Sequence, residues 1–328
     1  MTISLNSLSI EHPVFLAPLS GITDMPTRRT FREQGVGLVY SEMLASREVV
    51  SRPAEQQRRM RQGADEQPLA IQIAGCEAYW MGEAAKVCAG IGAQIIDINM
   101  GCPAKKVVKG QSGSALMRDL DHAAELIEAT VNAVDVPVTL KMRTGWDSSN
   151  RNAPELARRA EQLGVKMITV HGRTRCQFFT GVPDWEFVRQ VKDTVKIPVV
   201  INGDIVSEED AARALAQSGA DAVMVGRWAQ GRPWFPGQIR SFLETGRKQA
   251  DPPLAERWKI MREHYDGIIE HYGEALGVRT ARKHLGWYLA HMPEAASLRG
   301  ALMIKQSSAE VRAAFDFFAD EQLPLLAA

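Results

Sequence analysis

The sequence predicts a (β/α)8 TIM barrel followed by a small C-terminal all-helical domain, and three observations support this. Eight short apolar segments alternate with helical patterns over about 230 residues, the usual extent of such a barrel. Polar residues stand at or just past the C-terminal end of every apolar segment. A purely helical pattern then runs from Leu254 onwards. We therefore expect a barrel over residues 1–245 and a helical domain over residues 246–328.

The eight strand candidates are short, and several are rich in Val and Ile at successive positions. Continuous apolar runs of this kind are typical of parallel strands that are buried on both faces. In chain order, the candidates are Val14–Ala17, Leu38–Met43, Leu69–Ala74, Gln94–Asn99, Val138–Arg143, Met167–Gly172, Pro198–Gly203 and Ala222–Gly226.

Start and stop signals mark the helices between these strands. Ser207 is followed by Asp210, which approximates a capping box, and Asp24, Asp119 and Asp184 are further N-cap candidates. Glycines stand just before several strands, where a helix C-cap is expected: Gly35, Gly92, Gly164 and Gly219.

A doubly wound open sheet would give the same alternation of strands and helices. An open sheet concentrates its polar site residues at one switch point, whereas here every strand contributes one. In a closed barrel such positions converge on one mouth, so we favour the barrel. A Rossmann fold is rejected because the only similar glycine pattern, at Gly90 and Gly92, precedes a strand instead of following one.

The composition excludes several classes of protein. Hydrophobic residues make up 45% and charged residues 24% of the 328 residues, which is typical of a globular chain. Lys and Arg equal Asp and Glu at 39 each, so a nucleic-acid partner would have to meet a local basic patch. The N-terminus lacks a basic region and no long apolar run occurs, so neither secretion nor membrane insertion is expected.

The cysteines indicate a reducing compartment. Four cysteines in a chain of this length form no disulfide framework, no CxxC pair and no metal-ligand spacing. We therefore expect a cytoplasmic protein without a metal site. Cys76, Cys88 and Cys176 are interpreted as structural.

Cys102 differs from the other three cysteines in its position. It follows the fourth strand candidate within Gly101-Cys102-Pro103, where the glycine permits a tight turn and the proline fixes the backbone after it. A buried thiol is the commoner fate of a free cysteine. A turn at the barrel mouth instead presents the thiol, and an ordinary thiol with a pKa near 8.5 is mostly protonated at neutral pH. We interpret Cys102 as a catalytic proton donor.

Cationic and amide side chains gather at the other strand ends. Glycine turns with an arginine at the last two strands of a barrel suit a phosphate dianion, and the cations of this set with a histidine would repel one another without an anionic ligand. Gln72 offers amide donors and an acceptor that suit the edge of a heterocycle, or equally a loop backbone. The remaining residues of this set are Lys141, Arg143, His171, Arg173, Asn202, Gly203, Asp204, Gly226 and Arg227.

The helical domain follows a linker-like segment at 246–253, and a local basic excess lies between Arg227 and Lys305. On one predicted helix, Arg279 and Lys283 lie four residues apart, with Arg282 beside them. Like charges at this spacing disfavour a helix, so we expect the three to contact phosphates. Another basic cluster, expected on a solvated helix face, comprises Arg52, Arg58, Arg59 and Arg61. The residues expected to pack inward are Val278, Ala281, Leu285, Tyr288 and Leu289.

The motifs together resemble those of the tRNA-dihydrouridine synthases, over nearly the whole chain. Two C-terminal segments, Ala229–Trp234 and Ala281–Leu289, are similar to the bacterial B-type branch. The chain departs from the usual family pattern at Leu19, where Met is usual, at Ser20, where Ala is common, and in the loop 107–111. The segments that carry the resemblance are Ala17–Asp24, Ser41–Met43, Gln72–Gly75, Asp97–Lys106, Leu140–Trp146, His171–Thr174 and Asn202–Asp204.

The resemblance implies an FMN-binding barrel that, with the helical domain, binds tRNA. NADPH would reduce the flavin, a hydride would pass to C6 of a D-loop uridine, and Cys102 would protonate C5. Asn99 and Arg173 would hold the uracil, and we group Arg143 with the substrate-binding residues. A monomer is expected. The flavin contacts that the resemblance implies are Pro18, Leu19, Ser20, Gln72, Lys141, His171, Asn202, Gly203, Asp204, Gly226 and Arg227.

Two other functions remain open from the sequence. One is a flavin barrel that acts on a free pyrimidine, similar to the dihydroorotate dehydrogenases, although a small substrate needs no basic helical domain. The other is a non-catalytic RNA-binding protein that kept the fold, which would purify without a yellow colour.

Overall fold

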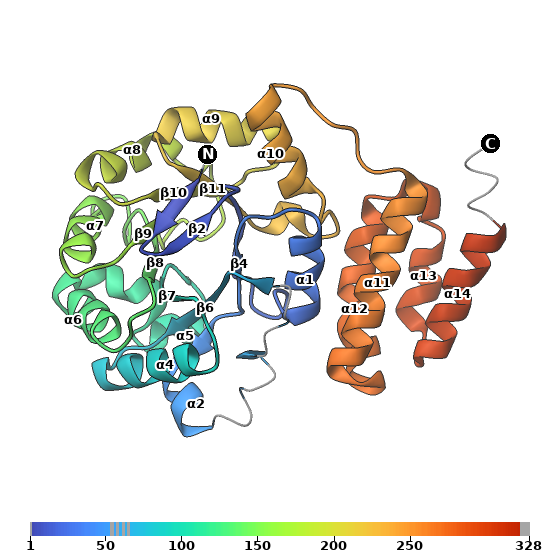
Figure 1. Cartoon of the computed structure of the whole chain (residues 1–328), viewed down its shortest axis with the longest axis horizontal. Helices are drawn as coiled ribbons and strands as arrows, with labels where there is room; N and C mark the ends of the chain where they lie inside the picture. The colour runs from blue at the N-terminus through green and yellow to red at the C-terminus, as the bar shows by residue number, and fades with distance from the viewer. Residues whose placement is uncertain (1, 53–55, 57–58, 61–62, 64–65, 322–328) are drawn as a thin grey trace.

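The computed structural model describes residues 2–52, 56, 59–60, 63 and 66–321. Within this part of the chain, eight parallel strands form a ring that is surrounded by helices, as predicted (Figure 1). The strands are β3 (Val14–Leu16), β4 (Val39–Tyr40), β6 (Leu69–Ala74), β7 (Ile95–Met100), β8 (Val138–Arg143), β9 (Met167–His171), β10 (Val199–Asn202) and β11 (Ala222–Val225).

The ring is closed between its first two strands. The strands pair in the order β3-β11-β10-β9-β8-β7-β6-β4, and a parallel bridge between Phe15 and Leu38 joins the two ends. The amide of Leu16 donates to the carbonyl of Leu38 at 2.9 Å across this junction. The alternative of an open sheet is therefore excluded.

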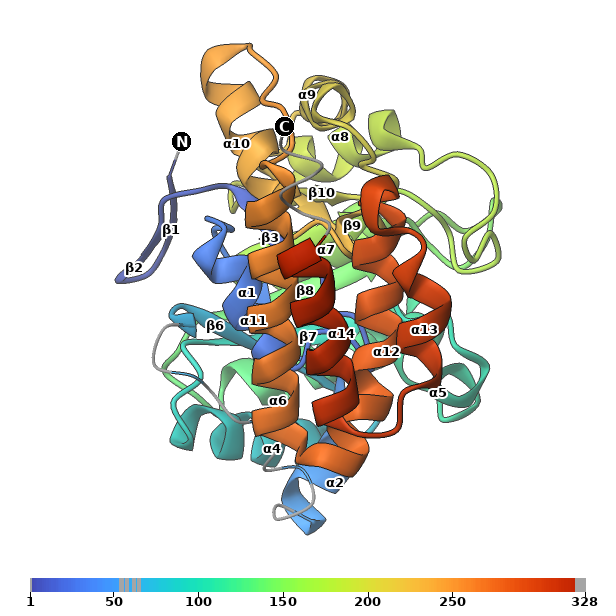
Figure 2. The same cartoon turned by 90° about the vertical axis from the view of Figure 1, so that its right-hand side faces the viewer.

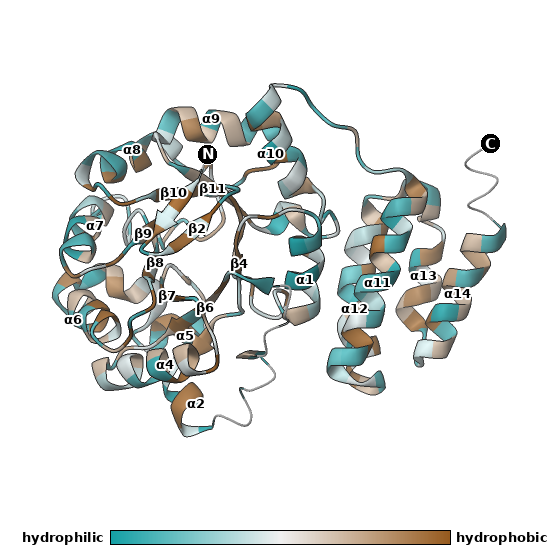
Figure 3. Ribbon diagram, viewed as in Figure 1, coloured by the Kyte–Doolittle hydropathy of each residue, from teal (hydrophilic) through white to brown (hydrophobic). Residues whose placement is uncertain are grey.

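Helices cover the outside of the barrel. Their inward faces pack on the strands, whereas α7 and α8 present much hydrophilic surface outward (Figure 3). The longer ones are α1 (Met25–Glu33), α4 (Ala78–Gly90), α6 (Leu120–Val131), α7 (Ala153–Gln162), α8 (Trp185–Thr194), α9 (Glu208–Ser218) and α10 (Phe235–Thr245), with the shorter α2 (Ser46–Ser51) and α5 (Lys105–Lys109).

The predicted helix caps are confirmed. Asp24, Asp119 and Asp184 each accept a hydrogen bond from the amide three residues later, at 2.9 to 3.1 Å. Ser207 and Asp210 form a full capping box at the start of α9. The four predicted C-cap glycines all have positive φ, a conformation that side chains rarely adopt, but only Gly219 is the C-cap residue itself. Gly35, Gly92 and Gly164 each stand one residue beyond the C-cap.

The second strand is shorter than predicted: within residues 38–43 only β4 forms, and the next strand, β5 (Leu44–Ala45), begins after them. The hydroxyl of Ser41 accepts the amide hydrogen of Gln72 at 3.0 Å, in place of a backbone carbonyl. A side chain that competes with the backbone ladder in this way interrupts a strand. The carboxylate of Glu42 accepts from the amide of Gly21 and lies 3.5 Å from Arg59. Arg58 and Arg61 lie outside the described residues.

The interior of the barrel changes from apolar to polar along its axis. A short hairpin, β1 (Ile3–Leu5) with β2 (Leu8–Ile10), joins the apolar cluster at the N-terminal end. Along β7 the inward residues are Ile95, then Asp97, then Asn99, because alternate residues of a strand share one face. This gradient places the functional side chains at the carboxyl ends of the strands.

Four helices form a second core beside the barrel, and the inward stripe predicted for Val278–Leu289 is confirmed. The segment 246–253 that leads to them contains no helix or strand. The four helices are α11 (Leu254–Tyr272), α12 (Glu274–Ala290), α13 (Leu298–Ile304) and α14 (Ser308–Glu321). None of the helices in the described residues is long and apolar enough to span a membrane.

These helices dock on the barrel through α1, against which α11 lies (Figure 2). The hydroxyl of Tyr272 donates to Asp24 at 2.9 Å, and the ring of His264 lies 3.1 Å from the Thr27 hydroxyl. Lys283 of α12 donates to the carbonyl of Gly21, in the loop after β3. The helical region therefore contacts the rim of the barrel mouth.

Candidate functional site

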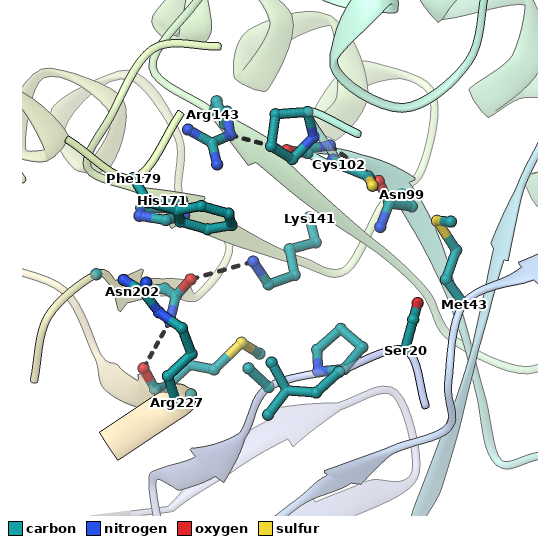
Figure 4. Close-up of a pocket in the computed structure, with 18 of the residues that line it drawn as sticks. Ser20, Met43, Asn99, Cys102, Lys141, Arg143, His171, Phe179, Asn202 and Arg227 are labelled. Atoms are coloured by element: carbon teal, nitrogen blue, oxygen red, sulfur yellow. Dashed lines mark hydrogen bonds between the residues drawn. The ribbon is translucent and has the colours of Figure 1, made fainter. Parts of the chain in front are cut away.

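A pocket opens at the carboxyl ends of the barrel strands (Figure 4). Its cavity volume is about 240 Å³. All eleven predicted cofactor residues line it, together with Asn99, Cys102 and Arg143. The eleven are Pro18, Leu19, Ser20, Gln72, Lys141, His171, Asn202, Gly203, Asp204, Gly226 and Arg227.

Cys102 is held at the pocket wall by its own backbone. Its amide donates to the side-chain oxygen of Asn99 at 2.9 Å, and its carbonyl accepts from the amide and hydroxyl of Ser114 at 3.1 and 2.8 Å. Because the peptide is fixed on both sides, the thiol can point into the pocket opposite Lys141 (Figure 4).

Lys141 lies between the two sides of the pocket. Its ammonium donates to the amide oxygen of Asn202 at 3.1 Å, and Asn202 in turn donates to the carbonyl of Met224 at 2.8 Å. Burial lowers the pKa of Lys141 to about 8, so the side chain stays protonated at neutral pH. Burial and the neighbouring cations also lower the pKa of His171 well below 6.5, so this imidazole is neutral.

The turn after β10 contacts Arg227, the cation that follows β11 and can bind an anion. Gly203 has φ +127°, and an added Cβ would come within 3.0 Å of Pro183, so only glycine fits here. Asp204 then pairs with Arg227 at 3.4 Å. The Arg227 guanidinium also lies over the ring of Phe179, 4.5 Å from its centroid, and remains half exposed to the pocket.

Arg143 and Arg173 are both almost completely buried, and they support loops. Arg143 donates to the carbonyls of Gly101, Thr174 and Phe178 at 2.7 to 2.8 Å, and burial lowers its pKa to about 10. Arg173 donates to Asp204 and to loop carbonyls, and it does not line the pocket. The uracil contact expected for Arg173 stays a prediction.

The three cations predicted to contact phosphates differ in their surroundings. Arg279 is exposed at the surface of α12. Arg282 donates to the carbonyl of Lys305 at 2.8 Å, and Lys283 donates to that of Gly21. Of these three side chains, Arg279 alone makes no hydrogen bond to another residue in the described part of the chain.

Several pocket residues were missed from the sequence. Met43 and Met224 supply apolar walls, and the exposed Trp228 and Phe179 stand at the rim. Trp228 follows Arg227 directly and could have been found from that position. Phe179 lies in a long loop after β9, and no sequence pattern marks it.

The charged lining of the pocket favours an anion. Lys141, Arg143 and Arg227 outnumber the carboxylate of Asp204, and a ligand with a phosphate group would balance the excess. Among the described residues, no three His, Cys, Asp or Glu side chains are arranged to hold a metal ion.

The structure is a closed parallel (β/α)8 barrel with a cationic pocket and the thiol of Cys102 at its carboxyl mouth. Active sites of barrel enzymes lie at this mouth, so the arrangement is that of a (β/α)8-barrel enzyme. Comparison with known families then gives the particular class. The family model described as dihydrouridine synthase (Dus) matches residues 15–322, so the chain belongs to that family. This confirms the resemblance inferred from the motifs.

Curated relatives match along almost their whole length. A protein of Rhodobacter capsulatus named probable tRNA-dihydrouridine synthase is 54% identical over 307 residues, 92% of this chain and 93% of that one. A protein of the same name from Rickettsia conorii is 49% identical over 314 residues, 94% of each chain. The tRNA-dihydrouridine synthase B of Pseudomonas aeruginosa is 44% identical over 315 residues, 96% of this chain and 95% of that one. The likeness to the B-type branch is thereby confirmed.

A solved structure shares the fold at low sequence identity. Histamine dehydrogenase from Rhizobium sp. 4-9 superimposes with a TM-score of 0.58 and 15% identity over 75% of this chain, which spans 47% of that longer protein. At this identity the likeness speaks for the barrel fold alone.

Proposed function

We propose that this protein is a tRNA-dihydrouridine synthase that binds FMN, takes reducing equivalents from NADPH and reduces a D-loop uridine of tRNA. The observation that carries the proposal is the position of Cys102, whose turn faces the same pocket as an excess of cations. Family membership and the names of the relatives support the same activity.

The residues that line the pocket suit FMN in their charge and polarity. Arg227 and the glycine turns after β10 and β11 would hold the phosphate, and the apolar Pro18 and Leu19 would lie along the ring. Gln72 and the ammonium of Lys141 would bond to the polar edge of the ring. The other residues that we assign to the cofactor are Ser20, His171, Asn202, Gly203, Asp204 and Gly226.

FMN, when bound and reduced by NADPH, would supply a hydride for C6 of the uridine. Cys102 donates its proton to C5 of the same ring, which completes the addition of two hydrogens across the C5–C6 bond. C5 carries enolate-like negative charge at that moment, so a neutral thiol can protonate it. The thiolate that remains lies near the buried cations Lys141 and Arg143, which stabilise it.

The uridine must leave the tRNA stack to reach this pocket, as in base flipping. Asn99 and Arg143 would border the flipped uracil, with Arg173 fixing Asp204 from behind. We assign catalysis to residues 1–245 and tRNA binding to residues 246–328, where Arg279 would contact a phosphate and Arg282 and Lys283 would support that surface. A cytoplasmic monomer fits this function.

Spectroscopy of the purified protein tests the proposal. We expect flavin absorbance in the visible region, release of FMN on heating, bleaching of the colour by NADPH, and its return when unmodified tRNA is added without oxygen. Return of the colour with a free pyrimidine but not with tRNA would instead favour a small-molecule dehydrogenase. A colourless protein that binds tRNA and takes up no added FMN would favour a non-catalytic RNA-binding protein.

A further inference from the structure

Asp97 is a buried carboxylate that the proposed chemistry does not use. It lies inside the barrel on β7, beside Gln72 on β6 and Thr139 on β8 in the strand register. Its two oxygens accept from the Gln72 amide nitrogen and from the Thr139 hydroxyl, both at 2.6 Å. The side chain is completely buried, and both of these hydrogen bonds come from the neighbouring strands.

The Gln72 amide continues this contact toward the pocket. Its oxygen accepts from the amide nitrogen of Asn99 at 2.7 Å, and the Asn99 oxygen accepts from the backbone amides of Gly101 and Cys102 at 3.1 and 2.9 Å. A continuous chain of hydrogen bonds therefore connects Asp97 to the peptide of the catalytic cysteine.

The direction of every bond in this chain follows from its two ends. Backbone N–H groups only donate, so the Asn99 oxygen must face Cys102 and its nitrogen must face Gln72. The Gln72 oxygen then faces Asn99, and its nitrogen faces residue 97. Because this nitrogen donates, the side chain at position 97 must accept a hydrogen bond. An ionised aspartate accepts and never donates, and it meets this requirement.

We propose that Asp97 is a positioning residue: it anchors the Gln72 amide at the end of the chain opposite the backbone amides, and it thereby holds Asn99 and the turn that presents Cys102. The consequence for chemistry rests on the proposed function, because it assumes that the thiol is the proton donor. The consequence for the thiol itself does not, since the geometry of the turn can be probed without substrate.

Two variants distinguish positioning of the Cys102 turn from electrostatic stabilisation by the Asp97 charge. Burial opposes the charge of Lys141 and the Asp97 carboxylate favours it, so charge compensation is the rival explanation. Asp97→Asn removes the charge but keeps an acceptor, because its oxygen can face Gln72 while its nitrogen donates to the Thr139 hydroxyl. Asp97→Leu has a similar size and removes both. If Asp97 positions the turn, only Asp97→Leu should disturb the site. If its charge compensates Lys141, both Asp97→Asn and Asp97→Leu should disturb it.

The first measurement is the rate at which iodoacetamide alkylates Cys102 in the purified holoenzyme, read by peptide mass spectrometry. The exposed Cys176 serves as the internal reference. We expect the ratio of the Cys102 rate to the Cys176 rate to rise about tenfold in Asp97→Leu, the loss of roughly one hydrogen bond. In Asp97→Asn the ratio should stay within about twofold of wild type.

The second measurement is the single-turnover rate with tRNA, together with the Kd for tRNA. Asp97→Leu should lose about tenfold in rate at unchanged Kd, and Asp97→Asn should keep the wild-type rate. If Asp97→Leu does not fold, Asp97→Ala removes the acceptor without added bulk and carries the same expectation.

An unchanged alkylation ratio in a folded Leu or Ala variant overturns the proposal, and so does an Asn variant that matches Leu in either measurement. If the wild type forms no dihydrouridine, the proposed function fails, whereas the alkylation ratios still decide whether Asp97 positions Cys102.

Discussion

Lys283 on α12 donates a hydrogen bond to the carbonyl of Gly21, which follows the pocket residue Ser20. The amide of the same glycine donates to Glu42, which lies between β4 and β5. The loop at the pocket rim is thus held from both sides, once by the barrel and once by the helical region. Of the α12 cations, Arg279 therefore faces solvent, whereas Lys283 supports the loop at the pocket rim.

Arg279 and Lys283 should therefore respond differently to substitution. Arg279→Glu should raise the Kd for tRNA and flatten its dependence on log salt by about one phosphate contact, because an exposed cation is lost. Flavin content should not change. Filter binding or fluorescence anisotropy over a range of salt concentrations measures both effects.

Lys283→Met should loosen the Gly21 loop and increase the loss of flavin on dialysis, since the hydrogen bond to the loop is removed. The tRNA salt slope should change less than in Arg279→Glu. Identical behaviour of the two variants in both assays would contradict this division of roles.

Removal of Arg227 should weaken flavin retention. Arg227→Ala loses a charge-assisted contact to phosphate, worth roughly 1.5–3 kcal/mol, so the Kd for FMN should rise at least tenfold. Fluorescence titration of the flavin-depleted protein gives this constant. Arg247→Ala, an exposed arginine in the linker segment, is the matched control and should bind FMN as wild type does. Equal FMN affinity of the Arg227 variant would place the phosphate elsewhere.

Cys102→Ala should separate the two halves of the reaction. NADPH should reduce the flavin at the wild-type rate, because no pocket cation is lost. Oxidation of the reduced flavin by tRNA should slow by about 10²–10⁴, the usual contribution of a positioned acid. Anaerobic stopped-flow absorbance measures both steps, with Cys176→Ala as the control for removal of a thiol. A Cys102 variant with wild-type oxidation by tRNA would rule out the thiol as the acid.

The interface between the barrel and the helices should weaken in mild acid. His264 is buried between the hydroxyls of Thr27 and Tyr288, at 3.1 and 3.0 Å, and burial lowers its pKa to about 4. The neighbouring His284 also has a lowered pKa. Between about pH 6.5 and pH 4 the unfolded chain takes up protons that the folded chain excludes, so stability falls as the pH falls.

Thermal unfolding across this range tests the interface. The contribution of His264 amounts to about 3 kcal/mol at most, from a shift of that size. His264→Gln should show a shallower decline of the melting temperature, and His122→Gln, on the barrel surface, should follow wild type. A His264 variant that declines as steeply as wild type would locate the acid sensitivity elsewhere.

The barrel and most of its pocket were predictable because one physical rule governs both. Parallel strands in a closed barrel end at the same mouth, so polar residues at strand ends, such as Gln72 and Asn202, must meet there. The N-caps were predictable for a similar reason, since a cap and its partner lie three residues apart.

Contacts between distant segments carried no such local signal. Arg173 could be assigned to the substrate from its motif, but its pairing with Asp204 and the loop carbonyls depends on the fold of two turns. Likewise the direction of the Gln72 amide depends on Asp97, on another strand. The Gly21 contact of Lys283 joins segments more than 250 residues apart, and no periodicity predicts it.

The central claim is that Cys102 of this protein completes the reduction of a tRNA uridine. The most direct test is mass spectrometric mapping of dihydrouridine in tRNA from a deletion strain that carries an empty plasmid, the wild-type gene or the Cys102→Ala gene. We expect a D-loop dihydrouridine to be absent with the empty plasmid, restored by the wild type and not restored by the variant. Unchanged dihydrouridine in the deletion strain, or full restoration by Cys102→Ala, would contradict the claim.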